Sequence, residues 1–298
     1  MKLATATLRN GEQFVGVVQG DTIIHIKRAE ELYKGDSLFP DCMQQVIEQH
    51  DTLELVQEIL ENLEKLHEEC AYPLNEVTLE GPIPNPRKNI FCVGKNYADH
   101  AIEMGSKEDI PEDIIVFTKA PTTVIGHKGT VLNHHQLTKQ LDYEGELAVV
   151  IGKKGIRISE EEASSYIFGY TIINDITARD LQSKHKQFFI GKSLDTTCPI
   201  GPWIVHHSEI QDANNLQIST KVNGEVRQNS NTSNCIFSIE KIISILSQGM
   251  TLEPGDIIAT GTPAGVGKGF KPPKFLEPGD VMEVTVEGIG TLVNTLEK

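Results

Sequence analysis

The sequence predicts a mixed, β-rich α+β fold, and three observations support this. After residue 90, short apolar segments alternate with clusters of Gly, Pro, Asn and Asp, which is typical of strands joined by turns. Only a few stretches show apolar residues at helical spacing. The 298 residues are 39% hydrophobic and 23% charged, as in ordinary globular proteins. A chain of this length forms one large domain, or a large domain with a smaller companion.

The first part of the chain predicts a small α+β domain. Residues 1–30 alternate apolar and polar side chains around glycines, which indicates two or three short antiparallel strands. Residues 41–68 carry apolar side chains at helical spacing and predict one or two amphipathic helices. Three prolines within residues 81–89 then mark a linker or domain entrance. We therefore expect a small domain at residues 1–75 and a larger one at residues 76–298.

The larger part is expected to consist mainly of strands. Asn-Gly at 223–224 predicts a tight hairpin, because this pair suits a type I′ turn. Helices are expected only at 160–165, at 238–247 and near residue 96. The apolar segments predict strands at 89–94, 114–119, 141–152, 166–175, 201–207, 216–228, 255–263 and 279–294.

Charge and cysteine usage exclude several classes of protein. The chain has 27 Lys and Arg against 42 Asp and Glu, a net charge of −15, which argues against nucleic acid and anionic membranes as partners. The five cysteines are widely spaced and lack a CxxC pair, so reduced thiols are expected instead of a disulfide framework or a zinc site. The chain starts without a signal-like apolar core, and its apolar runs are shorter than a membrane span. We expect a cytoplasmic protein.

Carboxylates at the ends of two expected strands indicate a cation site. Glu144 and Glu146 lie two residues apart, so they project from one face of their strand, and Asp142 precedes them on that face. A second apolar strand ends on Asp175. Close, partly buried carboxylates repel each other, and a hard divalent ion with oxygen ligands relieves this repulsion. The alternative is that the Glu-Gly-Glu segment is a solvated strand face.

Further polar residues follow other apolar segments. If a helix begins near Asn96, His100 and Glu103 are spaced i and i+3 and can meet as a general-base pair. The alternative is a surface histidine beside an acid by chance. The Gly-rich residues 259–267 predict a turn that presents backbone N–H groups to a carboxylate or oxyanion. Single cations beside strand-like segments would suit an anionic substrate, or would simply be solvated: Lys119, Arg179 and Lys192.

Taken in order, these motifs resemble the fumarylacetoacetate hydrolase family over residues 88–298. The matching pieces are GKNYADHAIEM, FTKAPT, DYEGELAVVIG, GYTIINDITARDLQ, GKSLDTTCPIGPW, VNGEVRQ, IFSIEKIIS and LEPGDIIATGTPAGVG. The resemblance implies a β-roll domain around Mg²⁺ or Mn²⁺, preceded by a small variable domain, and a homodimer. It also implies metal ligands at Glu144, Glu146 and Asp175, a catalytic dyad at His100 and Glu103, and an active-site lysine at Lys192. Substrate contacts are implied at Gln182, Arg179, Lys119, Gly261 and Thr262.

The resemblance also implies a small-molecule dicarboxylate or 2-oxo acid substrate and an enolate formed next to the metal. The motifs most resemble the acylpyruvase and oxaloacetate decarboxylase branch, so oxaloacetate decarboxylation is the first expectation. Hydrolysis of an acylpyruvate or fumarylpyruvate is the second. The third is the isomerase and decarboxylase chemistry of 5-carboxymethyl-2-hydroxymuconate and 5-oxopent-3-ene-1,2,5-tricarboxylate. A non-catalytic binding or scaffold protein on the same fold is the alternative from another class.

Overall fold

A large mixed sheet forms the framework of the protein. The computed structural model describes residues 1–49, 51–62 and 67–298. Within these residues, the main path of the sheet runs β4-β3-β2-β1-β14-β12-β11-β17-β6-β7, with β5 paired to β1 and β8 paired to β14. The strands are β1 (Lys2–Thr7), β2 (Gln13–Gln19), β3 (Thr22–His25), β4 (Ala71–Pro73), β5 (Thr78–Leu79), β6 (Ile90–Gly94), β7 (Ile115–Lys119), β8 (Val124–Ile125), β11 (Gly145–Ile151), β12 (Ile167–Asn174), β14 (Cys198–His206) and β17 (Ile257–Ala259).

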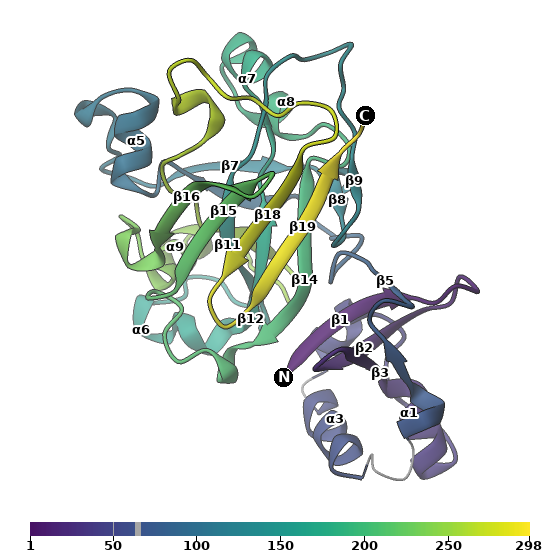
Figure 1. Cartoon of the computed structure of the whole chain (residues 1–298). Helices are drawn as coiled ribbons and strands as arrows, with labels where there is room; N and C mark the ends of the chain where they lie inside the picture. Colours follow the sequence, from purple (N-terminus) through teal and green to yellow (C-terminus); the bar gives the residue numbers. More distant parts are fainter. Residues whose placement is uncertain (50, 63–66) are drawn as a thin grey trace.

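A second sheet packs on the central strands of the first, as Figure 1 shows. Its order is β16-β15-β18-β19-β9. The alternation of side chains along β11 explains the two layers: Leu147 and Val149 join a core cluster with the second sheet, whereas Ala148 and Val150 join a cluster on the opposite face. The remaining strands are β9 (Thr130–Val131), β10 (Leu141–Asp142), β13 (Thr177–Ala178), β15 (Gln217–Val222), β16 (Glu225–Asn231), β18 (Val281–Val286) and β19 (Gly290–Leu296).

Helices are short and lie around the sheets. The longest in the larger part, α9, begins after Ser238, whose side chain accepts a hydrogen bond from the backbone N–H of Lys241. The helices are α1 (Ile26–Lys34), α2 (Met43–Glu48), α3 (Thr52–Glu61), α4 (His67–Cys70), α5 (Ala98–Met104), α6 (Glu160–Ala163), α7 (Arg179–His185), α8 (Phe189–Lys192) and α9 (Ile239–Ser247). None of the helices described is long and apolar enough to cross a membrane.

Strand β1 joins the N-terminal part to the rest of the molecule. Lys2 pairs with Val205 and Leu3 with Ile204, so the N-terminal strands extend the large sheet (Figure 1). One hydrophobic cluster contains Met43 and Val56 from the N-terminal helices together with Ala148 and Val150. The division expected near residue 75 therefore interrupts neither the sheet nor the core.

Most of the elements expected from the sequence are present. The β-rich α+β prediction is confirmed, and Asn223 and Gly224 join β15 to β16 with φ of 51° and 78°. The helical segment expected at 41–68 contains α2, α3 and α4, and its residues 50 and 63–66 lie outside the described residues. The expectation of one continuous strand at 141–152 is corrected. This segment is divided into β10 and β11, because β10 pairs with β13 while β11 pairs with β12. The helix expected near Asn96 begins at Ala98.

Candidate active site

Three buried carboxylates from two neighbouring strands meet at one point. Glu144 immediately precedes β11, Glu146 lies on β11, and Asp175 follows β12. Because β11 and β12 are paired, with Gly145 opposite Asn174, these acids become neighbours. One carboxylate oxygen from each lies within 4.8 Å of the others. The structure thus brings the three expected metal ligands together.

The glycine between the two glutamates lies under the second sheet. A Cβ atom on Gly145 would overlap Thr220 Oγ1 and would stand 2.8 Å from Val284 Cγ1. Gln228 holds the same peptide, because its Oε1 accepts a hydrogen bond from Gly145 N at 3.0 Å and its Nε2 donates to Thr262 Oγ1 at 2.7 Å. Gln228 had no expected role. The only sequence signal for it is its position after the hairpin, in VNGEVRQ.

Buried cations surround two of the three carboxylates. Lys192 Nζ lies 2.6 Å from Glu144 Oε2 and 2.7 Å from Asp175 Oδ2. Arg179 lies 2.7 Å from the other oxygen of Glu144, and Lys119 lies 2.8 Å from the other oxygen of Asp175. Burial alone would raise the pKa of Glu144, but Lys192 and Arg179 outweigh it and lower that pKa to about 2.

Glu146 lacks such a partner, and this decides what the site can hold. It forms no ion pair with any cation of the described chain, and its Oε2 accepts one hydrogen bond, from Gly261 N at 2.7 Å. Burial, followed by the charges of Asp175 and Glu144, raises its pKa well above the usual value. With Asp142, which pairs with Arg179, four buried carboxylates face three buried cations. An all-oxygen donor set that is short of positive charge fits a divalent cation such as Mg²⁺ or Mn²⁺.

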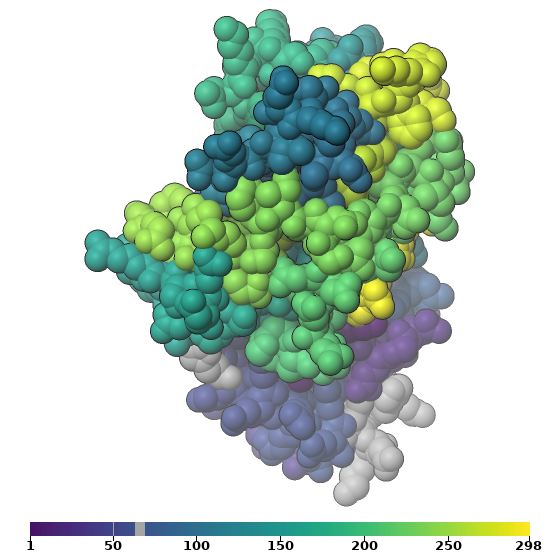
Figure 2. Space-filling view, turned by 90° about the vertical axis from the view of Figure 1, so that its left-hand side faces the viewer, coloured from purple at the N-terminus to yellow at the C-terminus, as the bar shows by residue number. Residues whose placement is uncertain are grey.

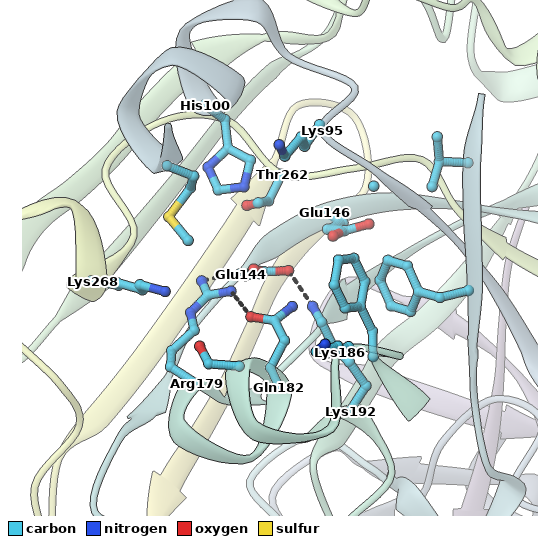
Figure 3. Close-up of a pocket in the computed structure, with 16 residues that line it drawn as sticks. Lys95, His100, Glu144, Glu146, Arg179, Gln182, Lys186, Lys192, Thr262 and Lys268 are labelled. Carbon is cyan, nitrogen blue, oxygen red and sulfur yellow. Dashed lines mark hydrogen bonds and ion pairs between the residues drawn. The ribbon is translucent and has the colours of Figure 1, made fainter. Parts of the chain in front are cut away.

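The histidine and glutamate of α5 also meet. His100 Nδ1 lies 3.5 Å from Glu103 Oε2, the i and i+3 arrangement expected from the sequence. Glu103 is fixed from the other side, because its carboxylate accepts a hydrogen bond from Gly265 N at 3.0 Å. His100 is 6% exposed and lines the cavity above Glu144 (Figure 3). His100 therefore faces Glu144 and Glu146 across the cavity, and Glu103 lies behind it.

The Gly-rich turn at 259–267 presents backbone N–H groups to carboxylates, and all three acceptors belong to the protein itself. Gly261 N donates to Glu146, Gly265 N to Glu103 and Gly267 N to Asp142. The turn thus holds three carboxylates of the protein in place. Its N–H groups at Gly261, Gly265 and Gly267 donate to these side chains and not to a substrate oxyanion. Asp142 is fully buried and also accepts from Arg179 Nε at 2.8 Å.

The expected substrate contacts fall into two groups. Arg179, Gln182 and Thr262 line the cavity, as does Lys192. Lys119 and Gly261 bond instead to Asp175 and Glu146 and are absent from the residues that line the described cavity. Their contact with a substrate stays a prediction, and the structure gives them a supporting position next to these acids. Lys119 is fully buried and its Nζ also donates to the carbonyl oxygen of Ile176.

The cavity has a volume of about 270 Å³, which is at the small end for ligand pockets and suits a small acid. Several of its lining residues had no expected role. These residues are Val93, Gly94, Lys95, Met104, Phe117, Ser183, Lys186, Phe188 and Lys268. Gly94, Lys95, Met104 and Phe117 lie inside motifs quoted above, and the others lie outside those motifs. Figure 3 shows Lys268 and Arg179 reaching toward the space between His100 and Gln182.

Residues 89–297 match the family model described as fumarylacetoacetate (FAA) hydrolase C-terminal. The chain belongs to the fumarylacetoacetate hydrolase family. It is an enzyme of this family, and the resemblance of its motifs is confirmed. The match begins at residue 89 and so leaves the N-terminal strands and helices outside the family model.

Relatives that cover the whole chain include enzymes of three kinds. The oxaloacetate tautomerase YisK of Bacillus subtilis is 54% identical over 99% of this chain and 100% of its own. A solved structure of a fumarylacetoacetate hydrolase from Exiguobacterium antarcticum has a TM-score of 0.81 and 39% identity, covering 100% of this chain and 99% of that one. The maleylpyruvate hydrolase from Sphingobium sp. SYK-6, solved with manganese(II) and pyruvate, has a TM-score of 0.78 and 29% identity over 100% and 99% of the two chains.

Proposed function

We propose that this enzyme interconverts the enol and keto forms of oxaloacetate with the help of a divalent cation. The observation that carries the proposal is the cluster of Glu144, Glu146 and Asp175, which is short of positive charge and opens into a small cavity. The 54% identity with an oxaloacetate tautomerase over nearly the full chain supports oxaloacetate as the substrate. The alternative from another class, a non-catalytic binding or scaffold protein, has no such support.

The three carboxylates would hold Mg²⁺ or Mn²⁺, which supplies polarisation of the 2-oxo oxygen of a bound acid. Around them, Arg179 and Gln182 bind and orient the substrate carboxylate, and their mutual hydrogen bond of 3.3 Å fixes both side chains. Lys192 provides an N–H donor beside the 2-oxo oxygen. His100, held by Glu103, moves the proton to and from carbon 3. The proton lost from the enol oxygen balances the one gained by carbon 3.

A second reaction that the same residues would support is decarboxylation of oxaloacetate. The maleylpyruvate hydrolase relative was solved with pyruvate, which is a product of maleylpyruvate hydrolysis and also the acid that remains when oxaloacetate loses CO₂, and this supports a site for a 2-oxo acid of that size. In this reaction the bond between carbons 3 and 4 breaks, its electron pair stays on carbon 3, and His100 then protonates that carbon. Tautomerisation and decarboxylation therefore require the same residues, including His100 for the protonation of carbon 3. The two reactions differ in whether carbon 4 is released.

The test follows both reactions in one experiment. Oxaloacetate is added as the enol to protein supplied with Mn²⁺ or Mg²⁺, and enol absorbance and released pyruvate are recorded together. We expect the enol to disappear at a rate proportional to enzyme, and we expect the Glu144→Ala/Glu146→Ala variant and EDTA-treated protein to lose this acceleration. Glu161→Ala, at an exposed position of α6, is the matched control. Equal rates with the double variant and the wild type would reject the proposal.

The proposal also covers the location, oligomeric state and partners of the enzyme. We propose a cytoplasmic homodimer that acts on a small-molecule 2-oxo acid and binds neither nucleic acid nor membrane. The acidic balance of 42 Asp and Glu against 27 Lys and Arg supports this choice of partners. Light scattering on the purified protein distinguishes a dimer from a monomer of 32.9 kDa.

A further inference from the structure

The lining of the cavity is cationic, although the protein carries a net charge of −15. Ion pairs neutralise Arg179 and Lys192, and Lys95 pairs with Asp109 at 3.0 Å. Lys186 and Lys268 form no ion pair with any residue in the described part of the chain. Two uncompensated ammonium groups therefore stand at the wall of the cavity. Its five cationic lining residues are Lys95, Arg179, Lys186, Lys192 and Lys268.

A buried carboxylate holds Lys268 in place. The backbone N–H of Lys268 donates to Asp142 Oδ2 at 3.0 Å, and the same oxygen accepts from Arg179 Nε at 2.8 Å. Gly267 N donates to the other oxygen of Asp142 at 2.6 Å. Asp142 thus fixes both the loop that carries Lys268 and the guanidinium that contacts Glu144. The hydrogen bonds of Asp142 thereby set the spacing between Lys268 and the metal-ligand cluster, which consists of Glu144, Glu146 and Asp175.

Lys268 and Arg179 are electrostatic neighbours. Partial burial, and then the charge of Arg179, lowers the pKa of the Lys268 ammonium. Lys268 reaches into the cavity from the segment at Gly267–Gly269 and Arg179 from the start of α7, and Figure 3 shows both pointing into the same space. A carboxylate between them would receive charge-assisted hydrogen bonds from two directions. Lys186 comes from the far end of α7 and lacks such a link to the metal-ligand cluster.

We propose that Lys268 determines specificity by binding the distal carboxylate of a dicarboxylic 2-oxo acid, and that it selects such an acid over its monocarboxylic counterpart. This inference rests on the proposed function, because it places the 2-oxo end of the substrate at Glu144, Glu146 and Asp175. Lys268 is then the only cation at the wall of the described cavity that is both unpaired and connected, through Asp142 and Arg179, to the metal-ligand cluster.

Calorimetric competition against oxalate on the Mn²⁺-loaded full-length protein tests the role of Lys268 without turnover. The probes are L-malate and L-lactate, which differ in the distal carboxylate. We expect Lys268→Gln to weaken L-malate about tenfold, the loss of one charged contact, and to leave oxalate and L-lactate unchanged. Lys268→Arg should retain most of the affinity for L-malate, because the positive charge remains. Lys271→Gln removes an equal charge from an exposed position of the same loop and should have no effect.

Three results would overturn the proposal: unchanged L-malate affinity in Lys268→Gln, an equal loss for all three acids, or the same loss in Lys271→Gln. Circular dichroism and Mn²⁺ affinity establish that the variants are folded and loaded. If a variant does not fold, Lys268→Met replaces it, and the same three results apply. A separate assay of oxaloacetate turnover by the wild type distinguishes failure of the proposed function from failure of this inference, since selective loss of L-malate would stand even without that activity.

Discussion

At the scale of single residues, the charge balance around Glu146 has a measurable consequence. Glu146 is buried beside Glu144 and Asp175 without a cation of its own. Glu146→Gln removes a repelling charge, so the metal-free variant should unfold at an equal or higher temperature than the wild type. The same change should weaken Mn²⁺ binding by more than about tenfold, because one of three ligands is lost. Thermal unfolding with and without Mn²⁺ measures both effects.

The control for this prediction is Glu161→Gln on α6, which changes the same charge at an exposed position. It should leave both the metal-free unfolding temperature and the Mn²⁺-dependent gain as they are in the wild type. A Glu146→Gln variant that still gains as much stability from Mn²⁺ as the wild type would contradict the assignment of this ligand.

A second residue, Gly269, connects the loop of Lys268 to α5. A Cβ atom at this position would overlap the carboxyl group of Glu103, which Gly265 N holds in place. Gly269→Ala should therefore displace Glu103 from His100 and lower kcat about tenfold or more, since general-base catalysis contributes roughly 10²–10⁴-fold. Mn²⁺ affinity should not change. Steady-state kinetics and Mn²⁺ titration separate the two effects.

The matched control for Gly269 is Gly249→Ala, because a Cβ atom there meets nothing within 4 Å. If Gly269→Ala and Gly249→Ala have the same kcat, the loop does not position Glu103. If Gly269→Ala also loses Mn²⁺ affinity, the structural change has reached the carboxylates. The expectation that α5 can be displaced without affecting the metal ligands would then be wrong.

Glu146 could be predicted as a site residue from the sequence, whereas Lys268 could not. A spacing of two residues on one strand was enough to predict that Glu144 and Glu146 are neighbours, and the apolar run ending on Asp175 supplied the third acid. Neither Lys268 nor Gln228 has a local pattern of this kind. Each acts because a partner distant in the sequence, Asp142 or Gly145, accepts or donates a hydrogen bond. Such partners become visible only when the strands are placed.

At the scale of elements, a loop histidine connects to strand β19. His127 Nδ1 accepts a hydrogen bond from Val293 N at 3.2 Å, which requires that nitrogen to be unprotonated. Burial, and then Lys128, lowers the pKa of His127 to about 4. Because the unfolded chain then binds this proton more readily, the free energy of unfolding should decrease as the pH falls from about 6.5 toward 4. Urea unfolding at several pH values measures this decrease.

Burial also lowers the pKa of His206, to about 4, and the pKa of His25, so the wild-type decrease contains the contributions of all three histidines. His127→Gln keeps an acceptor for Val293 N but cannot be protonated in this range. The variant should show a smaller decrease than the wild type. Identical pH dependence in the two proteins would mean that His127 makes no contribution.

Some strands and strand boundaries can be predicted from the sequence, and others cannot. The apolar segments and the Asn223-Gly224 turn were sufficient for most strands of both sheets, because local alternation and turn chemistry determine them. The break between β10 and β11 was missed, since both halves continue one apolar and acidic pattern. The break arises from pairing with different partners, β13 and β12, which lies beyond the range of local sequence.

At the scale of the whole molecule, the prediction of a separate domain at residues 1–75 can be tested by cooperativity. The sheet and one core cluster continue across this boundary. We therefore expect a single unfolding transition, with fluorescence of the one tryptophan, Trp203 on β14, coinciding with circular dichroism at 222 nm. Lys2 Nζ lies 5.0 Å from the Trp203 ring, so this probe reports on the junction itself.

Two separated transitions would support residues 1–75 as an independently folding domain, contrary to this expectation. A Leu3→Ala variant provides the comparison, because Leu3 is fully buried and pairs with Ile204. It should lower the common midpoint without splitting the transition. Loss of a buried leucine side chain costs about 2–5 kcal/mol.

The pairing of Lys2 with Val205 also sets an order of events during biosynthesis. Strand β1 leaves the ribosome early, whereas its partner β14 is made only after most of the chain. At roughly 5–20 residues per second, the delay is about 10–40 s. Throughout this time one edge of the nascent N-terminal sheet lacks its final neighbour, which is the condition in which chains pair with the wrong strand and need chaperones. The continuity of the sheet that unites the mature enzyme therefore exposes its precursor while translation continues.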